Sequence, residues 1–283
     1  MQDMQGRTAV VTGGAGGLGY GIAINLARAG MQVVLADLDE QATQQAAQRL
    51  SAAHGTRCLG VRCDVSDADS VHALADAAWS VFGGVDLLCN NAGVFVTGPI
   101  RELNLRDAQW LISVNVMGVI NGCRIFLPRM IARGRGGHIM NTASEAGLGL
   151  LEVGIDVGIY SATKHAVVGL SDALRREAAP FGIGVSVLCP SGVRTQIATA
   201  ARNRPDRYGG PAVASALPDQ DPAAAEAAPQ MMDPGEAGRL ALAGIRENAF
   251  IIVTHASTAS FTRTRASDVE KALERLAAHA GPA

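Results

Sequence analysis

Tyr160 and Lys164 lie four residues apart in a chain of 283 residues that has only three tyrosines and two lysines, against twenty-two arginines. Positions i and i+4 share one face of a helix, so a helix would hold the phenol and the ammonium in one small volume. A tyrosine hydroxyl ordinarily titrates near ~10, and a cation within ~4–6 Å favours its ionised form. We therefore expect Lys164 to lower the pKa of Tyr160 and the pair to donate and accept a proton. Arginine, with its broad and permanently charged fork, would be a poorer partner.

A glycine-rich stretch, Thr12–Gly19, follows the first apolar run of the chain and opens a longer periodic segment. Glycines allow a tight turn and a close approach of the backbone, while free N–H groups and the helix dipole attract negative charge. The stretch therefore predicts a site for the pyrophosphate of a dinucleotide, although tight turns also use glycine. Three spacings fit it, and the sequence does not choose among them: Gly14, Gly16 and Gly19; Gly13, Gly17 and Gly19; or Gly13, Gly16 and Gly19.

Asp37 ends the second apolar run, eighteen residues past Gly19. A carboxylate at that place would accept hydrogen bonds from the adenosine ribose hydroxyls and would repel a 2′-phosphate. Because the glycine stretch contains no lysine or arginine to offset this repulsion, we expect NAD as the cofactor. The alternative is an ordinary solvated turn carboxylate beside Asp39.

Short apolar runs alternate with longer segments of helical period, which is the pattern of a parallel sheet covered by helices on both faces. Right-handed crossovers would wind these elements into a single-domain, Rossmann-like α/β fold, with a doubly wound parallel sheet of about seven strands. The expected strands are Thr8–Thr12, Gln32–Asp37, Arg57–Cys63, Val85–Asn90, Gly137–Thr142, Gly184–Cys189 and Phe250–Val253. The expected helices are Leu18–Ala29, Glu40–Ala53, Ala68–Phe82, Arg106–Ala132, Tyr160–Ala179, Pro234–Arg246 and Ala266–Ala278.

Two segments interrupt this alternation, and we expect both to wall the substrate pocket. Glu145–Ile159 contains four glycines among aliphatic residues. Gln196–Asp233 is rich in alanine and proline, which is typical either of a linker or of a lid over the carboxyl edge of a sheet. We expect one domain over residues 1–283, with a substrate lid at 196–233 and a C-terminal helix at 266–278.

Composition excludes several classes of partner. A net charge of −2 leaves no basic patch for nucleic acid, and no stretch is expected to reach the ~18 apolar residues that span a bilayer. Met1–Arg7 has neither the charged nor the apolar region of a secretory signal, so we expect a cytoplasmic protein with a small-molecule partner. Five cysteines without a Cys-x-x-Cys pair predict buried reduced thiols and no metal site.

Further motifs follow Thr12–Gly19: Asp64-Val65, Asn90-Asn91-Ala92-Gly93, Asn115, Ser144, Tyr160-Ser161-Ala162-Thr163-Lys164 and Pro190-Ser191-Gly192-Val193-Arg194-Thr195. In order and spacing they closely resemble the short-chain dehydrogenase/reductase family, over about residues 5–255. The resemblance is to the compact branch, rather than to the extended branch of sugar-nucleotide epimerases and dehydratases. It implies an NAD-dependent oxidoreductase that moves hydride between a secondary alcohol and the cofactor.

The resemblance also implies four catalytic residues. Tyr160 would be the acid/base, Lys164 would lower its pKa and bind the nicotinamide ribose, and Ser144 would hydrogen-bond the substrate oxygen. Asn115 would hold a water that links the lysine to a proton relay, or else it merely satisfies buried backbone groups. Thr142 is a weaker candidate than Ser144 for the same role.

Cofactor contacts are implied in the same way. Asp64 and Val65 would flank the adenine, Asn90 and Gly93 would line the cleft, and Val193 and Thr195 would contact the carboxamide. The complete expected set is Gly13, Gly16, Gly17, Leu18, Gly19, Asp37, Leu38, Asp64, Val65, Asn91, Ala92, Gly93, Tyr160, Lys164, Pro190, Val193 and Thr195.

The chain departs from the family pattern at two places. The interval between Ser144 and Tyr160 is longer than usual, which indicates an enlarged loop on the substrate side. Ser191 replaces the glycine that commonly follows the proline, and this leaves the details of the nicotinamide contact open.

Apolar residues after Ser144 predict a bulky hydrophobic or aromatic secondary alcohol or ketone as substrate: Leu148, Leu150, Leu151, Val153, Ile155 and Val157. The stretches 118–122, 128–132 and 201–209 are also similar to dehydrogenases that oxidise benzylic (Cα) alcohols of lignin-derived aryl ethers. Two alternatives stay open. One is a non-catalytic NAD-binding sensor or scaffold, and the other is an epimerase or dehydratase with transient hydride transfer.

Two expected helices, Arg106–Ala132 and Tyr160–Ala179, are apolar on more than one face. This indicates that they bury surface against another subunit as well as against the sheet. The family resemblance implies a homodimer or homotetramer.

Overall fold

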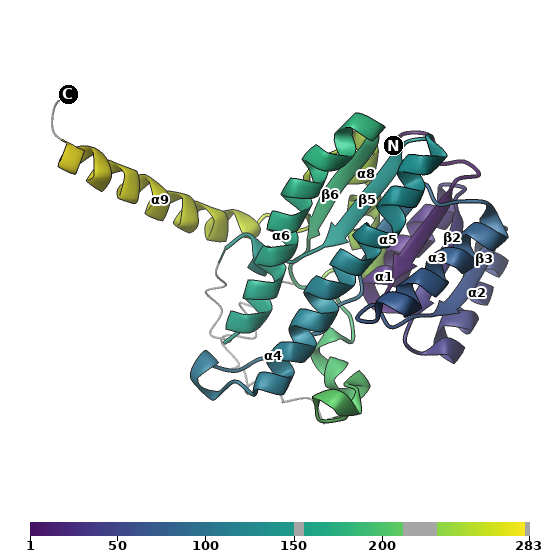
Figure 1. The fold of residues 1–283 in the computed structure, drawn as a ribbon, viewed down its shortest axis with the longest axis horizontal. Helices are drawn as coiled ribbons and strands as arrows, with labels where there is room; N and C mark the ends of the chain where they lie inside the picture. Colours follow the sequence, from purple (N-terminus) through teal and green to yellow (C-terminus); the bar gives the residue numbers. More distant parts are fainter. Residues whose placement is uncertain (150–155, 212–230, 281–283) are drawn as a thin grey trace.

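The computed structural model describes residues 1–149, 156–211 and 231–280, and its centre is a seven-stranded parallel sheet. The strands lie in the order β3-β2-β1-β4-β5-β6-β7, and every neighbouring pair is parallel (Figure 1). The predicted doubly wound α/β fold is therefore confirmed. The strands are β1 (Thr8–Thr12), β2 (Gln32–Asp37), β3 (Cys58–Arg62), β4 (Leu87–Asn90), β5 (Gly137–Thr142), β6 (Ile183–Cys189) and β7 (Ile251–Val253).

The strand order places a crevice beside the carboxyl ends of β1 and β4. From β1 the chain winds outward through β2 to β3, and it then returns to pair β4 against the other edge of β1. A reversal of this kind leaves neighbouring connections pointing apart, and ligands of such sheets bind in the resulting gap. Thr12 and Asn90 end the two strands that flank it.

One face of the sheet is covered by α1 (Gly17–Arg28), α2 (Glu40–His54) and α8 (Pro234–Glu247). Helices α1 and α8 touch through their backbones, since a Cβ on Gly21 would collide with the carbonyl of Pro234, and one on Gly238 with the carbonyl of Gly21. The side-chain amide of Asn25 closes the contact by donating to the carbonyl oxygens of Gly21 and Gly235, both at 2.9 Å. This contact fixes the angle at which α1 presents its first turn to the crevice.

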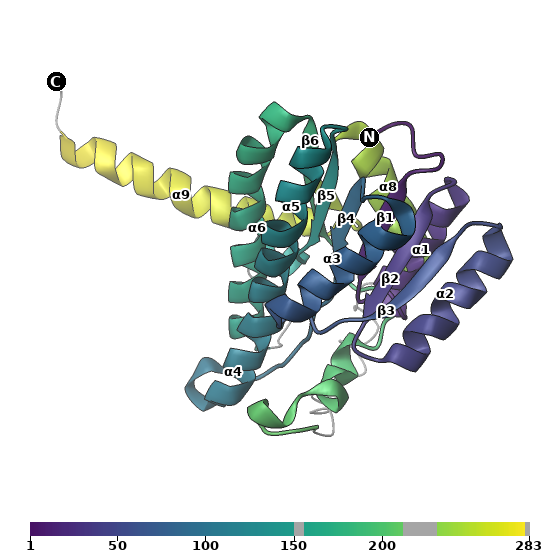
Figure 2. The same ribbon diagram turned by 45° about the vertical axis from the view of Figure 1, so that its right-hand side comes forward.

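The other face is covered by α3 (Ala68–Phe82), α5 (Gly118–Arg133) and α6 (Gly158–Ala178) (Figure 2). Aliphatic residues dominate this core, and Phe126 is its largest fully buried ring. All five cysteines are free thiols, and four of them are buried, as the sequence predicts; Cys58 is only half-buried.

The predicted helix Arg106–Ala132 is not one regular helix. It consists of α4 (Leu105–Leu111), a π-helical turn (Ile112–Met117) and α5. A π-helical turn is a short local change within a long apolar segment, and such turns occur often at functional sites. Asn115 lies in this turn.

The same stretch corrects the expectation about membrane spans. Within the described residues, Leu105–Arg133 is long and apolar enough to cross a bilayer, and 61% of its most apolar window is buried inside the protein. Its apolar side chains pack partly into the main core and partly into the cluster that contains Trp110 and Tyr160, which is why a core helix can pass a test based on length and composition.

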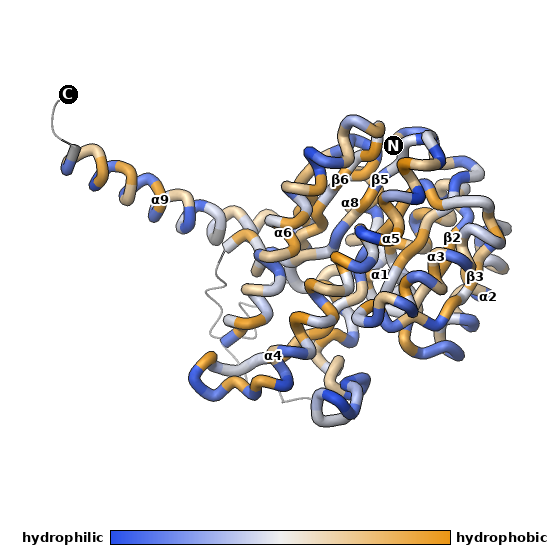
Figure 3. Tube along the Cα trace, in the orientation of Figure 1, coloured by the Kyte–Doolittle hydropathy of each residue, from blue (hydrophilic) through white to orange (hydrophobic). Residues whose placement is uncertain are grey.

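The C-terminal helix is longer than predicted. Helix α9 spans Thr258–Ala280 and projects away from the body of the molecule (Figures 1 and 2). Its first turns are polar and lack an apolar period, so periodicity locates only its second half. Apolar positions recur along it between hydrophilic ones (Figure 3), and Val269, Leu273 and Leu276 are exposed.

The segment expected to form a lid, 196–233, is only partly described. Its first part forms two short 3-10 helices, Ile197–Asn203 and Asp206–Tyr208, and residues 212–230 lie outside the described chain. Its end returns to the sheet edge, where Met232 bridges Val193 and Arg194 pairs with Asp233. The lid itself stays a prediction.

Candidate active site

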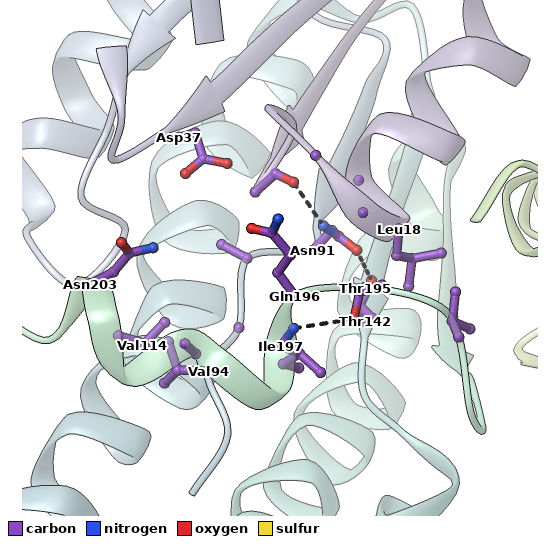
Figure 4. Close-up of a pocket in the computed structure, with 18 of the residues that line it drawn as sticks. Leu18, Asp37, Asn91, Val94, Val114, Thr142, Thr195, Gln196, Ile197 and Asn203 are labelled. Carbon is purple, nitrogen blue, oxygen red and sulfur yellow. Dashed lines mark hydrogen bonds between the residues drawn. The ribbon is translucent and has the colours of Figure 1, made fainter. Parts of the chain in front are cut away.

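A cavity of about 1030 Å³ opens at the carboxyl edge of the sheet, between β1 and β4. All the residues predicted to contact the cofactor line it, and so does Ser144. They come from the ends of β1, β2, β3, β4, β5 and β6, from α1 and from α6. In Figure 4, Asp37 lies well apart from Val94 and Val114, so the cavity has a carboxylate end and an apolar end.

The glycine stretch packs so tightly that the structure selects one of its three spacings. Gly13 (φ +65°) and Gly17 (φ +50°) adopt the left-handed conformation that favours glycine. A Cβ on Gly13 would lie 2.9 Å from the Cα of Ala92, and one on Gly19 would collide with the carbonyl of Gly13. Gly16, by contrast, has an extended backbone, and a Cβ there would meet no described atom within 4 Å. The spacing that the fold requires is therefore that of Gly13, Gly17 and Gly19.

This difference predicts opposite outcomes for two alanine substitutions. We expect Gly19→Ala to destabilise the cofactor-free protein by at least ~1–3 kcal/mol, because the added methyl group must displace backbone. Gly16→Ala, the matched control, should change the free energy of unfolding by no more than ~0.5 kcal/mol. Urea unfolding of both variants measures this, and equal losses would contradict the assignment.

Asn91 ties the glycine stretch to the neighbouring strand ends. Its amide nitrogen Nδ2 donates to the carbonyl of Thr12 (2.9 Å), and its Oδ1 accepts from the hydroxyl of Thr142 (3.4 Å), as Figure 4 shows. The hydroxyl of Thr12 accepts in turn from the backbone N–H groups of Asn91 (2.9 Å) and Ala92 (3.1 Å). The floor of the cavity is thus braced by bonds across three strands.

Asp37 lies at the far end of β2, with its carboxylate against the glycine stretch. Oδ2 accepts from the backbone N–H of Ala15 (3.2 Å), and Oδ1 accepts from that of Leu38 (2.8 Å). Burial raises the pKa of Asp37, and these two hydrogen bonds oppose the rise. The carboxylate is thus a built part of the cavity rather than a solvated turn residue.

Asp64 carries a partner that the sequence does not indicate. Its carboxylate accepts from the hydroxyl of Ser66 (2.6 Å) and pairs with Arg207 (3.2 Å), which arrives from the second 3-10 helix. Burial raises the pKa of Asp64, but the hydrogen bonds from Ser66 and Arg207 outweigh it, and the net shift is downward. Arg207 stands 143 residues further along the chain, and sequence patterns do not pair residues at that distance.

Tyr160 and Lys164 lie together on α6, as their spacing predicts, and both are buried, at 8% and 3% exposure. Nζ of Lys164 donates to the carbonyl of Thr142 (3.0 Å) and lies 5.6 Å from the centre of the Tyr160 ring. Burial raises the pKa of Tyr160 to about 12 and lowers that of Lys164 to about 8. The expected lowering of the Tyr160 pKa is therefore wrong for this structure: desolvation is the largest cause of the shift, and the ammonium of Lys164 is directed at the carbonyl of Thr142.

Ser144 follows β5 and caps a short 3-10 helix, Glu145–Gly147. Its Oγ accepts from the N–H of Ala146 (3.2 Å) and donates to the carbonyl of Pro190 (3.4 Å). The Ser144 hydroxyl partly offsets the rise in the pKa of Tyr160 caused by burial. Thr142 directs its hydroxyl to Asn91 instead, so Ser144 is the hydroxyl that meets the tyrosine.

Asn115 lies behind the cavity wall. Its Oδ1 accepts from the N–H of Val94 (2.8 Å), and its Nδ2 donates to the carbonyl of Val94 (3.0 Å) and to Thr163 (3.2 Å). A Cβ on Gly93 would lie 3.3 Å from Oδ1 of Asn115 and 3.5 Å from Nζ of Lys164. Asn115 thus satisfies buried backbone groups, which is the alternative to holding a water. It does so near Lys164.

The apolar end of the cavity differs from the one that the sequence predicts. Val157 joins a buried cluster around Tyr160, but Leu148 packs against the main core, and 150–155 lie outside the described residues. The ring of Phe95 meets Tyr160 edge-on, with centroids 4.8 Å apart. Besides Tyr160, the residues of this cluster that line the cavity are Val94, Trp110, Val114 and Ala200.

Asn90 is also misplaced by the sequence interpretation. It is buried beneath the cavity, where Nδ2 donates to Oδ1 of Asn141 (2.9 Å), and a Cβ on Gly122 would collide with it. Asn90 therefore joins β4 to β5 and to α5 rather than lining the cleft, whereas its three successors do line it.

Comparisons with known proteins agree with this geometry. The family model of short chain dehydrogenases matches residues 7–206. The C alpha-dehydrogenase of a Sphingobium species is 40% identical over 210 residues, which cover 74% of this chain and 68% of that protein. The 1-deoxy-11-beta-hydroxypentalenate dehydrogenase of Streptomyces exfoliatus is 39% identical over 68% of this chain and 69% of its own.

Solved structures give the same result over nearly the whole chain. A short chain dehydrogenase/reductase from Burkholderia phymatum, solved in complex with NAD, superposes with a TM-score of 0.84 at 39% identity. The match covers 95% of this chain and 96% of that one. The motifs that line the cavity therefore occur here in a fold that is shared along nearly the whole chain.

Proposed function

Since this chain belongs to the family of short chain dehydrogenases, we propose that it is an NAD(H)-dependent oxidoreductase that interconverts a bulky, hydrophobic or aromatic secondary alcohol and its ketone. The observation that carries the proposal is the convergence of Ser144, Tyr160 and Lys164 on the wall of a cavity whose far end presents Asp37. The glycine stretch supports a dinucleotide in the same cavity, because its backbone is bare of side chains that would block close approach.

The glycine stretch and Asp37 would hold NAD⁺, which would supply the acceptor for the hydride of the carbinol carbon. Tyr160 accepts the proton of the alcohol hydroxyl, and it returns a proton to the carbonyl oxygen in the reverse direction. Ser144 holds the same oxygen in place, and the charge of Lys164 stabilises Tyr160 after its proton has left. Asn115 positions the site through Val94 and Thr163; a water held by it remains a prediction.

The substrate class rests on the apolar end of the cavity, where Val94, Trp110 and Val114 lie in the same cluster as Tyr160. An NAD-dependent activity screen over secondary alcohols, sorted by size and aromaticity, tests the proposal. Aryl carbinols, including benzylic alcohols of aryl ethers, should be oxidised best, followed by terpenoid and steroid alcohols. Turnover of short polar alcohols alone would contradict the hydrophobic substrate, and net NADH formation separates a dehydrogenase from an epimerase.

We expect Asp37→Ala to lower the preference for NAD over NADP. The substitution removes an acceptor for the ribose hydroxyls and the negative charge that repels a 2′-phosphate. Loss of a charge-assisted hydrogen bond corresponds to about a ten- to hundredfold change in the ratio of the two kcat/KM values. The control is Asp69→Ala, because Asp69 is an exposed carboxylate outside the cavity. An unchanged ratio in Asp37→Ala would refute the assignment.

The pKa values of Tyr160 and Lys164 predict how the two directions depend on pH. Nζ of Lys164 lies 5.6 Å from the centre of the Tyr160 ring, so we expect the two groups to titrate as a pair whose first proton leaves near the lower of their pKa values, about 8. Alcohol oxidation requires the pair to have lost that proton, so its kcat/KM should rise as the pH passes through about 8, while that of ketone reduction should fall. Initial rates from about pH 6 to about pH 10 measure both limbs. If kcat/KM rises with pH in both directions, or falls in both, Tyr160 and Lys164 are not the acid and base.

We also propose a cytoplasmic homodimer or homotetramer. Ile112 and Met117, in the π-helical turn between α4 and α5, are exposed although apolar, which supports contact with a second subunit. Light scattering coupled to gel filtration should give a mass of two or four chains, and a monomer would contradict it.

A further inference from the structure

The carboxylate of Glu145 holds together three segments that are distant in sequence. Oε1 accepts from the hydroxyl of Ser191 (2.6 Å), and Oε2 accepts from the hydroxyl of Thr258 (3.4 Å). Ser191 belongs to the Pro190–Thr195 segment after β6, and the buried Thr258 is the first residue of α9. Glu145 itself directly follows Ser144.

Further bonds hold the Pro190–Thr195 segment at the same place. The N–H of Glu145 donates to the carbonyl of Pro190 (3.0 Å), which also accepts from Ser144. The N–H of Ser191 donates to the hydroxyl of Thr254 (3.1 Å), which in turn contacts Nδ1 of His255. The segment is therefore anchored on one side by the loop that carries Ser144 and on the other by the connection to α9.

Ser191 is the position at which this chain departs from the family pattern. A glycine there has no hydroxyl and could not bond to Glu145. Ser191 also lines the cavity, next to the residues proposed to contact the nicotinamide end of the cofactor. The serine that replaces the glycine thus has a hydrogen-bond acceptor, the carboxylate of Glu145, at 2.6 Å.

Glu145 directly follows Ser144 in the chain, and its charge also affects the proton-transfer group. The chief cause of the raised pKa of Tyr160 is burial, and the negative charge of Glu145 adds to it. The other titratable groups around this position are Lys164 on α6, Cys189 at the end of β6 and His255 before α9. Of these, Lys164 carries a positive charge near neutral pH, and it lies against Tyr160 and the carbonyl of Thr142.

We propose that Glu145 is a positioning residue of the active site, whose carboxylate fixes the Pro190–Thr195 segment against Ser144 and so sets how the cofactor's nicotinamide end meets Tyr160. The effect on how the nicotinamide end meets Tyr160 rests on the proposed function. The structural part of the proposal, control of the cofactor-binding segment, does not depend on turnover. Both parts are open to measurement with substitutions that keep the shape of the side chain or remove it.

The binding experiment is a fluorescence titration of NADH with Glu145→Ala, Ser191→Ala, Glu145→Gln and the exposed control Glu274→Gln. Loss of a hydrogen bond to a charged group corresponds to about a ten- to hundredfold rise in Kd. We expect that rise in both alanine variants, a much smaller one in Glu145→Gln, whose amide oxygen still accepts from Ser191, and none in the control. Ser191→Ala leaves Glu145 intact, so it decides the matter if Glu145→Ala does not fold. An unchanged Kd in Ser191→Ala would overturn the proposal.

The pH profile separates positioning from a merely structural role. Glu145→Gln removes a negative charge near Tyr160, so the rising limb of alcohol oxidation should move to lower pH, whereas Ser191→Ala should leave it in place. A limb that does not move in Glu145→Gln would refute the action on Tyr160. If the wild-type protein binds NADH but oxidises no alcohol, the proposed function fails, while the Kd values still test the positioning role.

Discussion

Replacing Tyr160 by phenylalanine is expected to lower kcat for alcohol oxidation by about 10²–10⁴-fold, the usual contribution of a positioned acid/base. The hydroxyl is the only atom removed, and the buried ring keeps its packing against Phe95. Because the change acts on proton transfer and not on the glycine stretch or Asp37, the Kd for NADH should stay within about twofold. Steady-state rates with an aryl carbinol and a fluorescence titration of NADH measure the two effects.

Tyr20→Phe provides the matched control for this experiment. Tyr20 is a half-buried tyrosine of α1, outside the main cavity, and it should tolerate the loss of its hydroxyl with unchanged kcat. If Tyr160→Phe binds NADH normally and turns over as fast as the wild-type protein, the catalytic proposal fails. The non-catalytic NAD-binding sensor would then be the better interpretation.

Lys164→Arg is expected to lower kcat by about 10²–10³-fold, although it conserves the positive charge. Lys164 is almost fully buried, and its ammonium is fitted between the carbonyl of Thr142 and the ring of Tyr160. A guanidinium is larger and planar, and it does not give up its proton, so the coupled loss of a proton near pH 8 would disappear. The rising limb of the pH profile should therefore move to higher pH together with the fall in rate.

The chain offers one other lysine as a control. Lys271 is exposed on α9, far from the cavity in sequence and fold, and Lys271→Arg should leave both kcat and the pH profile unchanged. Since the protein has only these two lysines, the pair of variants separates the site from a general effect of replacing lysine by arginine. If Lys164→Arg has the rate and the pH profile of the wild-type protein, a positive charge alone suffices. The compact shape of the ammonium would then not matter.

Much of the fold could be predicted because its signals are local. Strands β1, β2 and β5 begin and end at the predicted residues, since each contains a short apolar run and is followed or preceded by residues typical of turns. The parallel sheet brings the carboxyl ends of its strands to one edge, so motifs at those ends meet in one cavity whatever the lengths of the helices between them. The spacing of Tyr160 and Lys164 likewise needs only the helical period.

Other features could not be predicted because they depend on contacts between distant segments. Which glycines are required follows from the approach of Gly13 to Ala92 and of Gly17 to Thr195, and the pairing of Asp64 with Arg207 and of Glu145 with Ser191 joins residues far apart in the chain. The direction of the Tyr160 pKa shift depends on burial, which is a property of the whole packed core.

The amino-acid sequence alone thus predicts whether each segment is a helix or a strand, and which residues lie at the carboxyl edge of the sheet. The packed fold decides which of those groups touch, how deeply each is buried and where its proton goes. The reason is physical: periodicity and turn chemistry act over a few neighbouring residues, whereas desolvation and hydrogen bonding at the site are set by side chains that the sequence separates by dozens of positions.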